Sequence, residues 1–240
     1  MFLLFDFTKV TILIKFAPQT TTHTMIKGVI FDMDGVLVNN MAVHFKAFAA
    51  IAERYNLKAE EGADFSHLNG RGNDDIINAL FPRHIVEAKG VEALAAEKEA
   101  LYREIYAPTI KPTEGLVELL EQLHKAGIPC AVGSSGPRVN VNFVLEKCGI
   151  APYFSAIISG DMVTHCKPDP EIFLTAASKL GVAPCDCLVF EDAISGVMAA
   201  RAAQMKVITL TSTHTREQLL EAAPDRIVED FREVSLQDIL

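Results

Sequence analysis

Two hydrophobic periodicities alternate along the chain from residue 26 onward. Short apolar runs of strand length occur at 26–31, 128–133, 156–159, 187–190 and 206–211. Between and around the later runs, apolar positions recur every three or four residues, at 114–126, 139–148, 170–180 and 196–203. Short apolar runs predict buried strands, and a spacing of three to four predicts amphipathic helices. Strands that alternate with helices predict an α/β fold with a Rossmann-like, doubly wound parallel sheet as its core.

One region between the first and second predicted strands departs from this alternation. Helical periodicity covers three stretches there without a convincing strand between them, at 42–55, 74–80 and 91–106. We therefore predict a helical cap domain at 39–111, inserted into a core formed by 25–38 and 112–240. The short links near Asn39 and Lys111 suggest a hinge that opens and closes the cap over the core.

Residues 1–24 precede the first predicted strand and are expected to be an extension outside the core. The first eighteen residues are apolar, but Asp6, Lys9 and Lys15 interrupt them and no Ala-x-Ala cleavage pattern follows. This segment is a poor match to a signal peptide and too short for a membrane-spanning helix. Because Met25 directly precedes a strong strand, we weigh a disordered extension against a native start at Met25.

Composition and charge narrow the classes of partner. Half of the residues are hydrophobic and 22% are charged, which is typical of a globular protein. The formal net charge of −9 and the scattered basic residues argue against nucleic-acid binding but allow a small anionic ligand at a local site. The five cysteines are odd in number and form no pair of CxxC units, so we expect free thiols in the reducing cytoplasm. We expect neither a membrane partner nor a nucleic-acid partner.

Polar side chains follow four of the predicted strands. Ligands of doubly wound sheets bind at the carboxyl ends of the strands, so we expect these side chains to share one crevice. Each has a structural explanation when taken alone, as a turn, a helix cap or a solvated loop lysine, but together they favour a functional site. In chain order they are Asp32 and Asp34, Ser134 and Ser135, Lys167, and Glu191 and Asp192.

The chemistry of this set points to phosphoryl transfer. Carboxylates brought together from two strands repel one another unless a divalent cation joins them, and hard oxygen ligands suit Mg2+, which we expect between Asp32 and Asp192. Lys167 would supply positive charge to a bound phosphate and to the nucleophile. Asp32 could then attack phosphorus while Asp34, two residues further along the same turn, protonates the leaving group.

As an ordered set, these residues resemble the motifs of the haloacid dehalogenase superfamily. The similarity is to its β-phosphoglucomutase-like branch of phosphatases and phosphomutases, which carries a helical cap, and it covers residues 26–230. The four motifs are Phe31–Val36, the strand end at Ser134, Cys166–Pro170 and Val189–Ala193.

The resemblance implies a role for each motif residue. Asp32 becomes an aspartyl phosphate, Asp34 is the general acid and base, and Ser134 and Lys167 hold the transferring phosphoryl group. Mg2+ is then bound by Asp32, by the backbone carbonyl of Asp34 and by Asp192, with Glu191 nearby or ligating.

The cap is where members of this family select their substrates. The sugar-phosphate mutase has, on its first cap helix, a histidine that relays between cap closure and the acid and base, and His44 occupies the matching position. We expect five residues to contact substrate: His44, Asn69, Gly70, Arg71 and Ser135.

The resemblance favours a phosphatase that acts on a small phosphorylated metabolite of the sugar-phosphate type, functioning as a monomer. The mutase grips a second phosphate with basic residues where this chain has Asn69 and Asn73, and it has a serine and a lysine where this chain has Gly136 and Pro137. The alternatives are a β-phosphoglucomutase that interconverts β-glucose 1-phosphate and glucose 6-phosphate, and an inorganic pyrophosphatase. A receiver-like phospho-acceptor domain is a non-enzyme alternative, against which the long helical insertion argues.

Overall fold

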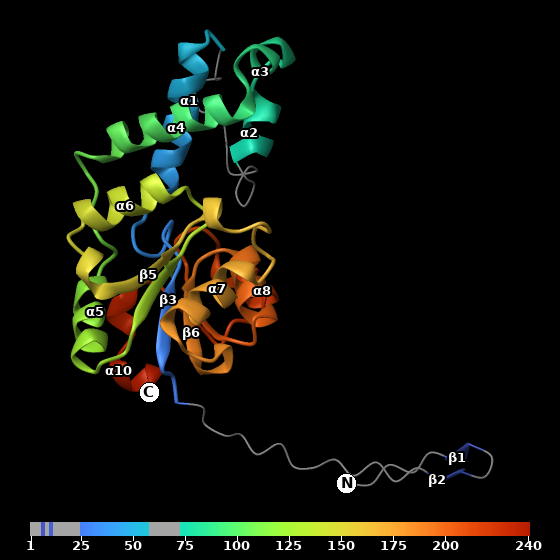
Figure 1. The fold of residues 1–240 in the computed structure, drawn as a ribbon, viewed down its shortest axis with the longest axis vertical. Coiled ribbons are helices and arrows are strands. Elements are labelled where there is room, and N and C mark those ends of the chain that lie inside the picture. Colours follow the sequence, from blue (N-terminus) through green and yellow to red (C-terminus); the bar gives the residue numbers. More distant parts are fainter. Residues whose placement is uncertain (1–5, 8–9, 12–24, 58–72) are drawn as a thin grey trace.

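The structure is a computed structural model that describes residues 6–7, 10–11, 25–57 and 73–240 (Figure 1). Within these residues, the core is a six-stranded sheet with strand order β5-β4-β3-β6-β7-β8, and each neighbouring pair is parallel. This confirms the predicted Rossmann-like fold class. The strands are β3 (Gly28–Phe31), β4 (Cys130–Gly133), β5 (Phe154–Ile158), β6 (Cys187–Glu191), β7 (Lys206–Leu210) and β8 (Arg226–Val228). Two further short strands, β1 (Asp6–Phe7) and β2 (Val10–Thr11), form an antiparallel pair.

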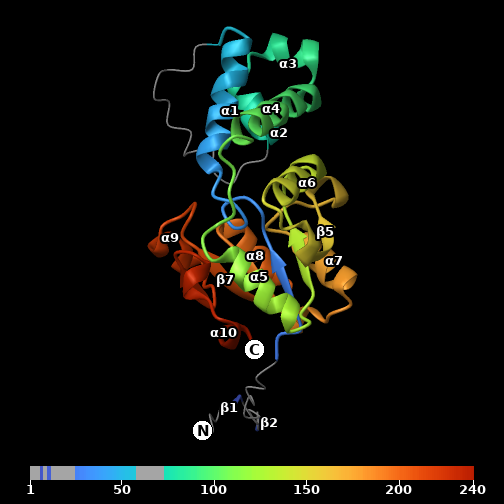
Figure 2. The ribbon, with the colours of Figure 1, turned by 90° about the vertical axis from the view of Figure 1, so that its left-hand side faces the viewer.

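Helices cover both faces of the sheet because successive strand residues point to opposite sides. In β3, Val29 and Phe31 belong to the hydrophobic cluster that includes α5 and α6, whereas Ile30 belongs to the cluster formed with α7 and α8. Figure 1 shows α5 and α7 on opposite sides of the sheet, and Figure 2, turned by 90°, shows α5 in front of it. The core helices are α5 (Leu116–Lys125), α6 (Arg138–Lys147), α7 (Glu171–Leu180), α8 (Ile194–Ala202), α9 (Arg216–Glu221) and α10 (Leu236–Ile239).

A second group of helices stands over the carboxyl ends of the strands (Figure 1). α1 and α4 pack against each other, and Ile51 of α1 and Leu94 of α4 are fully buried. Buried residues of this group, including Phe48 and Tyr102, join the same continuous hydrophobic cluster as Phe31 of the sheet. The group therefore packs on the edge of the core where the strands end. Its helices are α1 (Met41–Arg54), α2 (Asn73–Leu80), α3 (Arg83–Lys89) and α4 (Val91–Tyr106).

All five cysteines have free thiols in the structure. Among the described residues, none of the helices combines the length and the apolar character that crossing a membrane requires.

Candidate active site

The predicted site residues meet at the switch point of the sheet, where the order of successive strands reverses. β3 lies between β4 and β6, and Phe31 pairs with Val132 on one side and with Phe190 on the other, so the three strands end at nearly the same level. Asp32 follows β3 directly and continues the ladder, since its N–H donates to the carbonyl of Phe190 at 2.9 Å. Ser134 follows β4, and Glu191 is the last residue of β6. Such a switch point is where ligands of doubly wound sheets bind.

Lys167 joins two of the acids. Its Nζ lies 2.5 Å from Asp32 Oδ1 and 2.6 Å from Glu191 Oε1, and all three side chains are buried. Burial lowers the pKa of Lys167, but the charges of Asp32 and Glu191 outweigh it and raise that pKa above its ordinary value. Lys167 is therefore a permanent cation beside Asp32 Oδ1. Its place opposite the acids agrees with the sequence-based expectation.

Both carboxylate oxygens of Glu191 accept hydrogen bonds from other residues of the protein. While Oε1 accepts from Lys167, Oε2 accepts from the backbone N–H groups of Asp192 at 2.8 Å and Ala193 at 2.9 Å. Helix α8 approaches so closely that a Cβ on Gly196 would lie 1.7 Å from Glu191 Oε1. Glu191 thus fixes both Lys167 and the start of the loop that carries Asp192.

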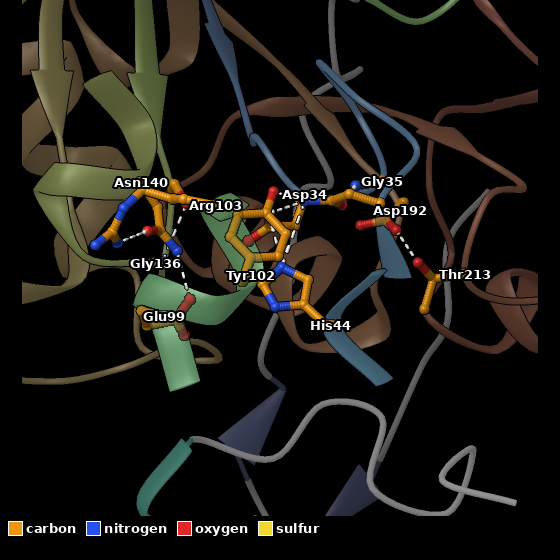
Figure 3. A network of polar contacts seen from close by, with 12 residues as sticks. Asp34, Gly35, His44, Glu99, Tyr102, Arg103, Gly136, Asn140, Asp192 and Thr213 are labelled. Atoms are coloured by element: carbon orange, nitrogen blue, oxygen red, sulfur yellow. Dashed lines mark hydrogen bonds and ion pairs between the residues drawn. The ribbon is translucent and has the colours of Figure 1, made fainter. Parts of the chain in front are cut away.

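The loop after β7 holds Asp192 in place. Sequence reasoning identified Asp192 but missed this loop. Thr213 Oγ1 donates a short hydrogen bond to Asp192 Oδ2, and Ser212 Oγ lies 3.1 Å from the same oxygen (Figure 3). Ser212 Oγ also lies 2.5 Å from the carbonyl oxygen of Gly35, so it connects this loop to the turn after β3. The only sequence signal was the run of hydroxyl residues after the fifth core strand.

Negative charge accumulates at this point. Burial raises the pKa of Asp32 to about 7, and the charges of Glu191 and Asp34 act in the same direction, while Lys167 opposes them. Burial, Glu191 and Asp32 likewise raise the pKa of Asp192 well above its ordinary value. One lysine cannot balance three buried carboxylates, and oxygen donors are what Mg2+ prefers. The residues present therefore fit a divalent cation beside Asp32 and Asp192.

Asp34 lies in a separate group of contacts with residues from the cap side. Asn40 Nδ2 donates to Asp34 Oδ1 at 2.5 Å and to the hydroxyl of Tyr102 at 2.6 Å. His44 Nε2 lies 3.3 Å from the same Asp34 oxygen, and its ring stacks on Tyr102 with 4.2 Å between centroids (Figure 3). Lys98 Nζ lies 2.9 Å from His44 Nδ1. Of these partners of Asp34, the sequence pointed only to His44.

The protonation of this group follows from its contacts. A lysine ammonium can only donate, so His44 Nδ1 accepts from Lys98 and the proton on Nε2 faces Asp34. Burial alone would raise the pKa of Asp34, but hydrogen bonds from His44 and Asn40 and the charge of Lys98 lower it below its ordinary value. Asp34 therefore stays ionised to a lower pH than its neighbour Asp32.

Ser134 and Ser135 follow β4 directly, but only Ser134 has its side chain inside the site. The Ser134 hydroxyl is buried and accepts from the N–H of Gly136 at 3.0 Å, whereas Ser135 is exposed. A Cβ on Gly136 would lie 3.3 Å from Ser134 Oγ and 3.6 Å from Asp34 Oδ2, so both oxygens face the space above this glycine. The remaining expected substrate contacts, Asn69, Gly70 and Arg71, lie outside the described residues.

Comparison with known proteins agrees with this geometry. A family model described as haloacid dehalogenase-like hydrolase matches residues 26–204. The chain belongs to this family. It is an enzyme of the branch that contains phosphatases and phosphomutases, as the ordered motifs implied.

Two curated proteins and one solved structure illustrate what this chain is similar to. Fructose-1-phosphate phosphatase YqaB of Escherichia coli K12 is 34% identical over 75% of this chain and 94% of its own. The chloroplastic protein SUPPRESSOR OF QUENCHING 1 of Arabidopsis thaliana is 34% identical over 90% of this chain, which spans only 21% of that protein. A crystal structure of a HAD hydrolase, family IA, variant 3, from Entamoeba histolytica superposes with a TM-score of 0.80 at 29% identity, covering 89% of this chain and 97% of its own.

Proposed function

We propose that this protein is a Mg2+-dependent phosphatase that hydrolyses a small sugar-phosphate-type monoester through an aspartyl phosphate on Asp32. One observation carries the proposal: Asp32 and Asp34, two residues apart on one turn, are held by separate sets of hydrogen-bond partners. With separate partners, one carboxylate can act as the nucleophile while the other is held for proton transfer. Membership of a phosphatase-containing family supports the same reaction class.

In the first step, the Asp32 oxygen not held by Lys167 attacks phosphorus. The new bond joins this carboxylate oxygen to phosphorus, while the bond from phosphorus to the ester oxygen breaks. Lys167 and the Ser134 hydroxyl are placed to bind the phosphoryl oxygens as charge moves onto them. The departing alkoxide takes a proton from Asp34, which takes up this proton from solvent when the negative charge of the bound phosphate raises its pKa.

In the second step, Asp34 acts as a base. It accepts a proton from a water molecule, whose oxygen attacks phosphorus and releases inorganic phosphate, restoring the Asp32 carboxylate. The ionised state of Asp34 in the unliganded protein suits this step. His44, fixed by Lys98 and Tyr102, holds the Asp34 carboxylate in place for both proton transfers.

The metal would be held by Asp32, the carbonyl of Asp34 and Asp192. When bound, Mg2+ neutralises the buried carboxylates and the phosphate so that the nucleophile can approach an anion. Since both Glu191 oxygens already accept hydrogen bonds, we assign Glu191 the role of fixing Lys167 and Asp192 rather than that of a direct ligand.

The mutase remains the second candidate because of one contact. A histidine from the first cap helix reaches the acid-base residue, as the resemblance implied for the mutase, and His44 does so here. Against it, Gly136 and Pro137 offer no side-chain hydrogen-bond donor where the mutase has a serine and a lysine. A second phosphate would find few partners on this side of the crevice.

A substrate screen tests the proposal. Purified protein is incubated with sugar phosphates, nucleotides and pyrophosphate in MgCl2 or EDTA, and phosphate release is measured together with glucose 6-phosphate formation from β-glucose 1-phosphate. We expect Mg2+-dependent phosphate release from sugar phosphates, and no release by the Asp32→Asn variant. Conversion to glucose 6-phosphate with little free phosphate would identify the mutase instead, and release from pyrophosphate alone would identify a pyrophosphatase.

A further inference from the structure

A buried polar cluster ties cap helix α4 to core helix α6. Asn140 of α6 is 1% exposed; its Nδ2 donates to Glu99 Oε2 at 2.6 Å and its Oδ1 accepts from Arg103 Nη1 at 2.7 Å (Figure 3). Glu99 and Arg103 lie one turn apart on the same face of α4. A single core amide therefore contacts two charged cap side chains, using its acceptor for one and its donor for the other.

The cluster is continuous with the acid-base group. Glu99 Oε1 accepts from Lys98 Nζ at 2.9 Å, and Lys98 Nζ in turn lies 2.9 Å from His44 Nδ1. His44 Nε2 faces Asp34. Hydrogen-bond contacts thus run from Asn140 on the core, through Glu99 and Lys98 on α4 and then His44, to the carboxylate of Asp34.

These contacts depend strongly on the position of the cap. Lys98 and Glu99 are 2% and 5% exposed, and burying such groups costs free energy unless each hydrogen bond is made with good geometry. An apolar contact between α4 and α6 would tolerate sliding, whereas a donor and an acceptor on one amide fix direction as well as distance. When α4 leaves α6, water replaces the lost partners and the constraint on Glu99 ends.

We propose that Asn140, together with Glu99 and Arg103, forms a cap-to-core latch that positions Lys98 and His44 against Asp34. Asn140 is then a positioning residue for proton transfer, acting only when the cap is docked. The inference rests on the proposed function, because it assigns the latch an effect on Asp34 as general acid.

A swap of donor and acceptor tests the latch. Asn140→Asp places a carboxylate against Glu99 at hydrogen-bond distance, so the two repel. Adding Glu99→Gln restores the contact in reverse, since the introduced amide nitrogen can donate to the introduced carboxylate while the amide oxygen still accepts from Lys98. Arg103 keeps an acceptor in both variants. Asn142→Asp, an exposed position on the same helix, is the matched control.

Two readouts separate positioning from general damage. For the alkyl phosphate that the wild type hydrolyses fastest, we expect kcat/KM of Asn140→Asp to fall about 30-fold, within the range that a misplaced general acid loses. For p-nitrophenyl phosphate, whose leaving group needs no proton, the fall should be only about 3-fold. The double variant should recover most of the loss, and Asn142→Asp should match the wild type.

Hydrogen exchange gives an answer independent of activity. In Asn140→Asp, amides of α4 and α6 should exchange faster while those of β3 and β6 stay protected, and the double variant should restore protection. Equal losses for both substrates, or no recovery in the double variant, would overturn the latch. A wild type without phosphatase activity would instead refute the proposed function, and the exchange experiment would still decide whether the latch exists.

Discussion

Asp34 must serve opposite steps, so its substitution should separate them. Asp34→Asn keeps the shape and can still contact Asn40 and His44, but it can neither donate an acidic proton nor accept one from water. With p-nitrophenyl phosphate, attack by Asp32 needs no proton donor, whereas release of the phosphoryl group from Asp32 needs the base.

We therefore expect Asp34→Asn to release about one nitrophenolate per enzyme in a burst and then to turn over roughly 100-fold or more slowly than the wild type. Alkyl phosphates should show no burst. Rapid-quench kinetics measure both phases. A steady state without a burst, slowed equally for both substrate types, would remove Asp34 from the acid-base role.

Thr213 and Ser212 orient Asp192, so their hydroxyls should influence metal affinity. Outer partners of metal ligands commonly change affinity about 10-fold to 100-fold when they are lost. Thr213→Val keeps the side-chain shape but removes the donor to Asp192 Oδ2. We expect the Mg2+ dissociation constant to rise about 10-fold, measured by calorimetric titration without substrate.

Thr211→Val, two residues earlier in the same loop, is the control for Thr213. The side-chain hydroxyls that contact Asp192 Oδ2 are those of Ser212 and Thr213, so the Mg2+ affinity of Thr211→Val should equal that of the wild type. If Thr213→Val also binds Mg2+ with unchanged affinity, Asp192 is either not a ligand or is held well enough by Ser212.

The site residues that could be predicted from the sequence lie in short local motifs, whereas the residues that were missed do not. Asp32 and Lys167 stand in short motifs beside recognisable strand ends, so their meeting could be predicted. Asn40, Lys98 and Asn140 stand in ordinary helical or linker sequence, and their importance arises only when α1, α4 and α6 come together. No periodicity within a single segment encodes such contacts.

Among elements, the long amphipathic helices and buried strands were predicted close to their observed positions. α1, α2 and α4 match the predicted helical stretches of the cap, and β3, β4 and β6 match predicted strands. The short elements α3, α9, β8 and α10 were missed. β8 has three residues at the sheet edge, and windows this short hold too few apolar positions for a period to appear.

Gly196 shows how packing between elements can reverse a local preference. Replacing an interior helix glycine by alanine normally stabilises a helix by about 1 kcal/mol. In α8, however, the new Cβ would lie 1.7 Å from Glu191 Oε1, and that oxygen is held by Lys167. Either the helix or Glu191 must move.

We expect Gly196→Ala to lower the free energy of unfolding by about 1–3 kcal/mol, as overpacking of a filled site does, and to reduce kcat by displacing Lys167. Urea unfolding and steady-state kinetics measure the two effects. Ser195→Ala, the preceding position of α8, should be neutral or slightly stabilising. A stabilised and fully active Gly196→Ala would mean that Glu191 can move without consequence.

At the scale of the whole molecule, the buried charges of the site lower the stability of the fold. The core must bring Asp32, Glu191 and Asp192 together at the ends of β3 and β6, where burial penalises each carboxylate. Lys167 offsets part of this cost, and the cap contributes the partners of Asp34. The chain thus carries a local excess of negative charge at the point where an anionic substrate must bind, which only a bound cation can reverse.

The stability of the metal-free protein should therefore depend on pH in a diagnostic direction. The pKa of Asp32 is about 7 in the folded protein but about 3.9 in an unfolded chain, so between these values the folded state binds more protons. Asp192 shifts the same way. Hence the free energy of unfolding should rise as the pH falls from about 8 to about 6, the reverse of a salt-bridged carboxylate.

Urea unfolding in EDTA at several pH values measures this slope, and saturating Mg2+ should flatten it while raising stability most at the alkaline end, where the carboxylates are ionised. Asp32→Asn removes one of the titrating groups, so its metal-free slope should be shallower and its gain from Mg2+ smaller. A metal-free protein whose stability falls on acidification through this range would show that Lys167 alone already neutralises the site, and the argument for a cation there would fail.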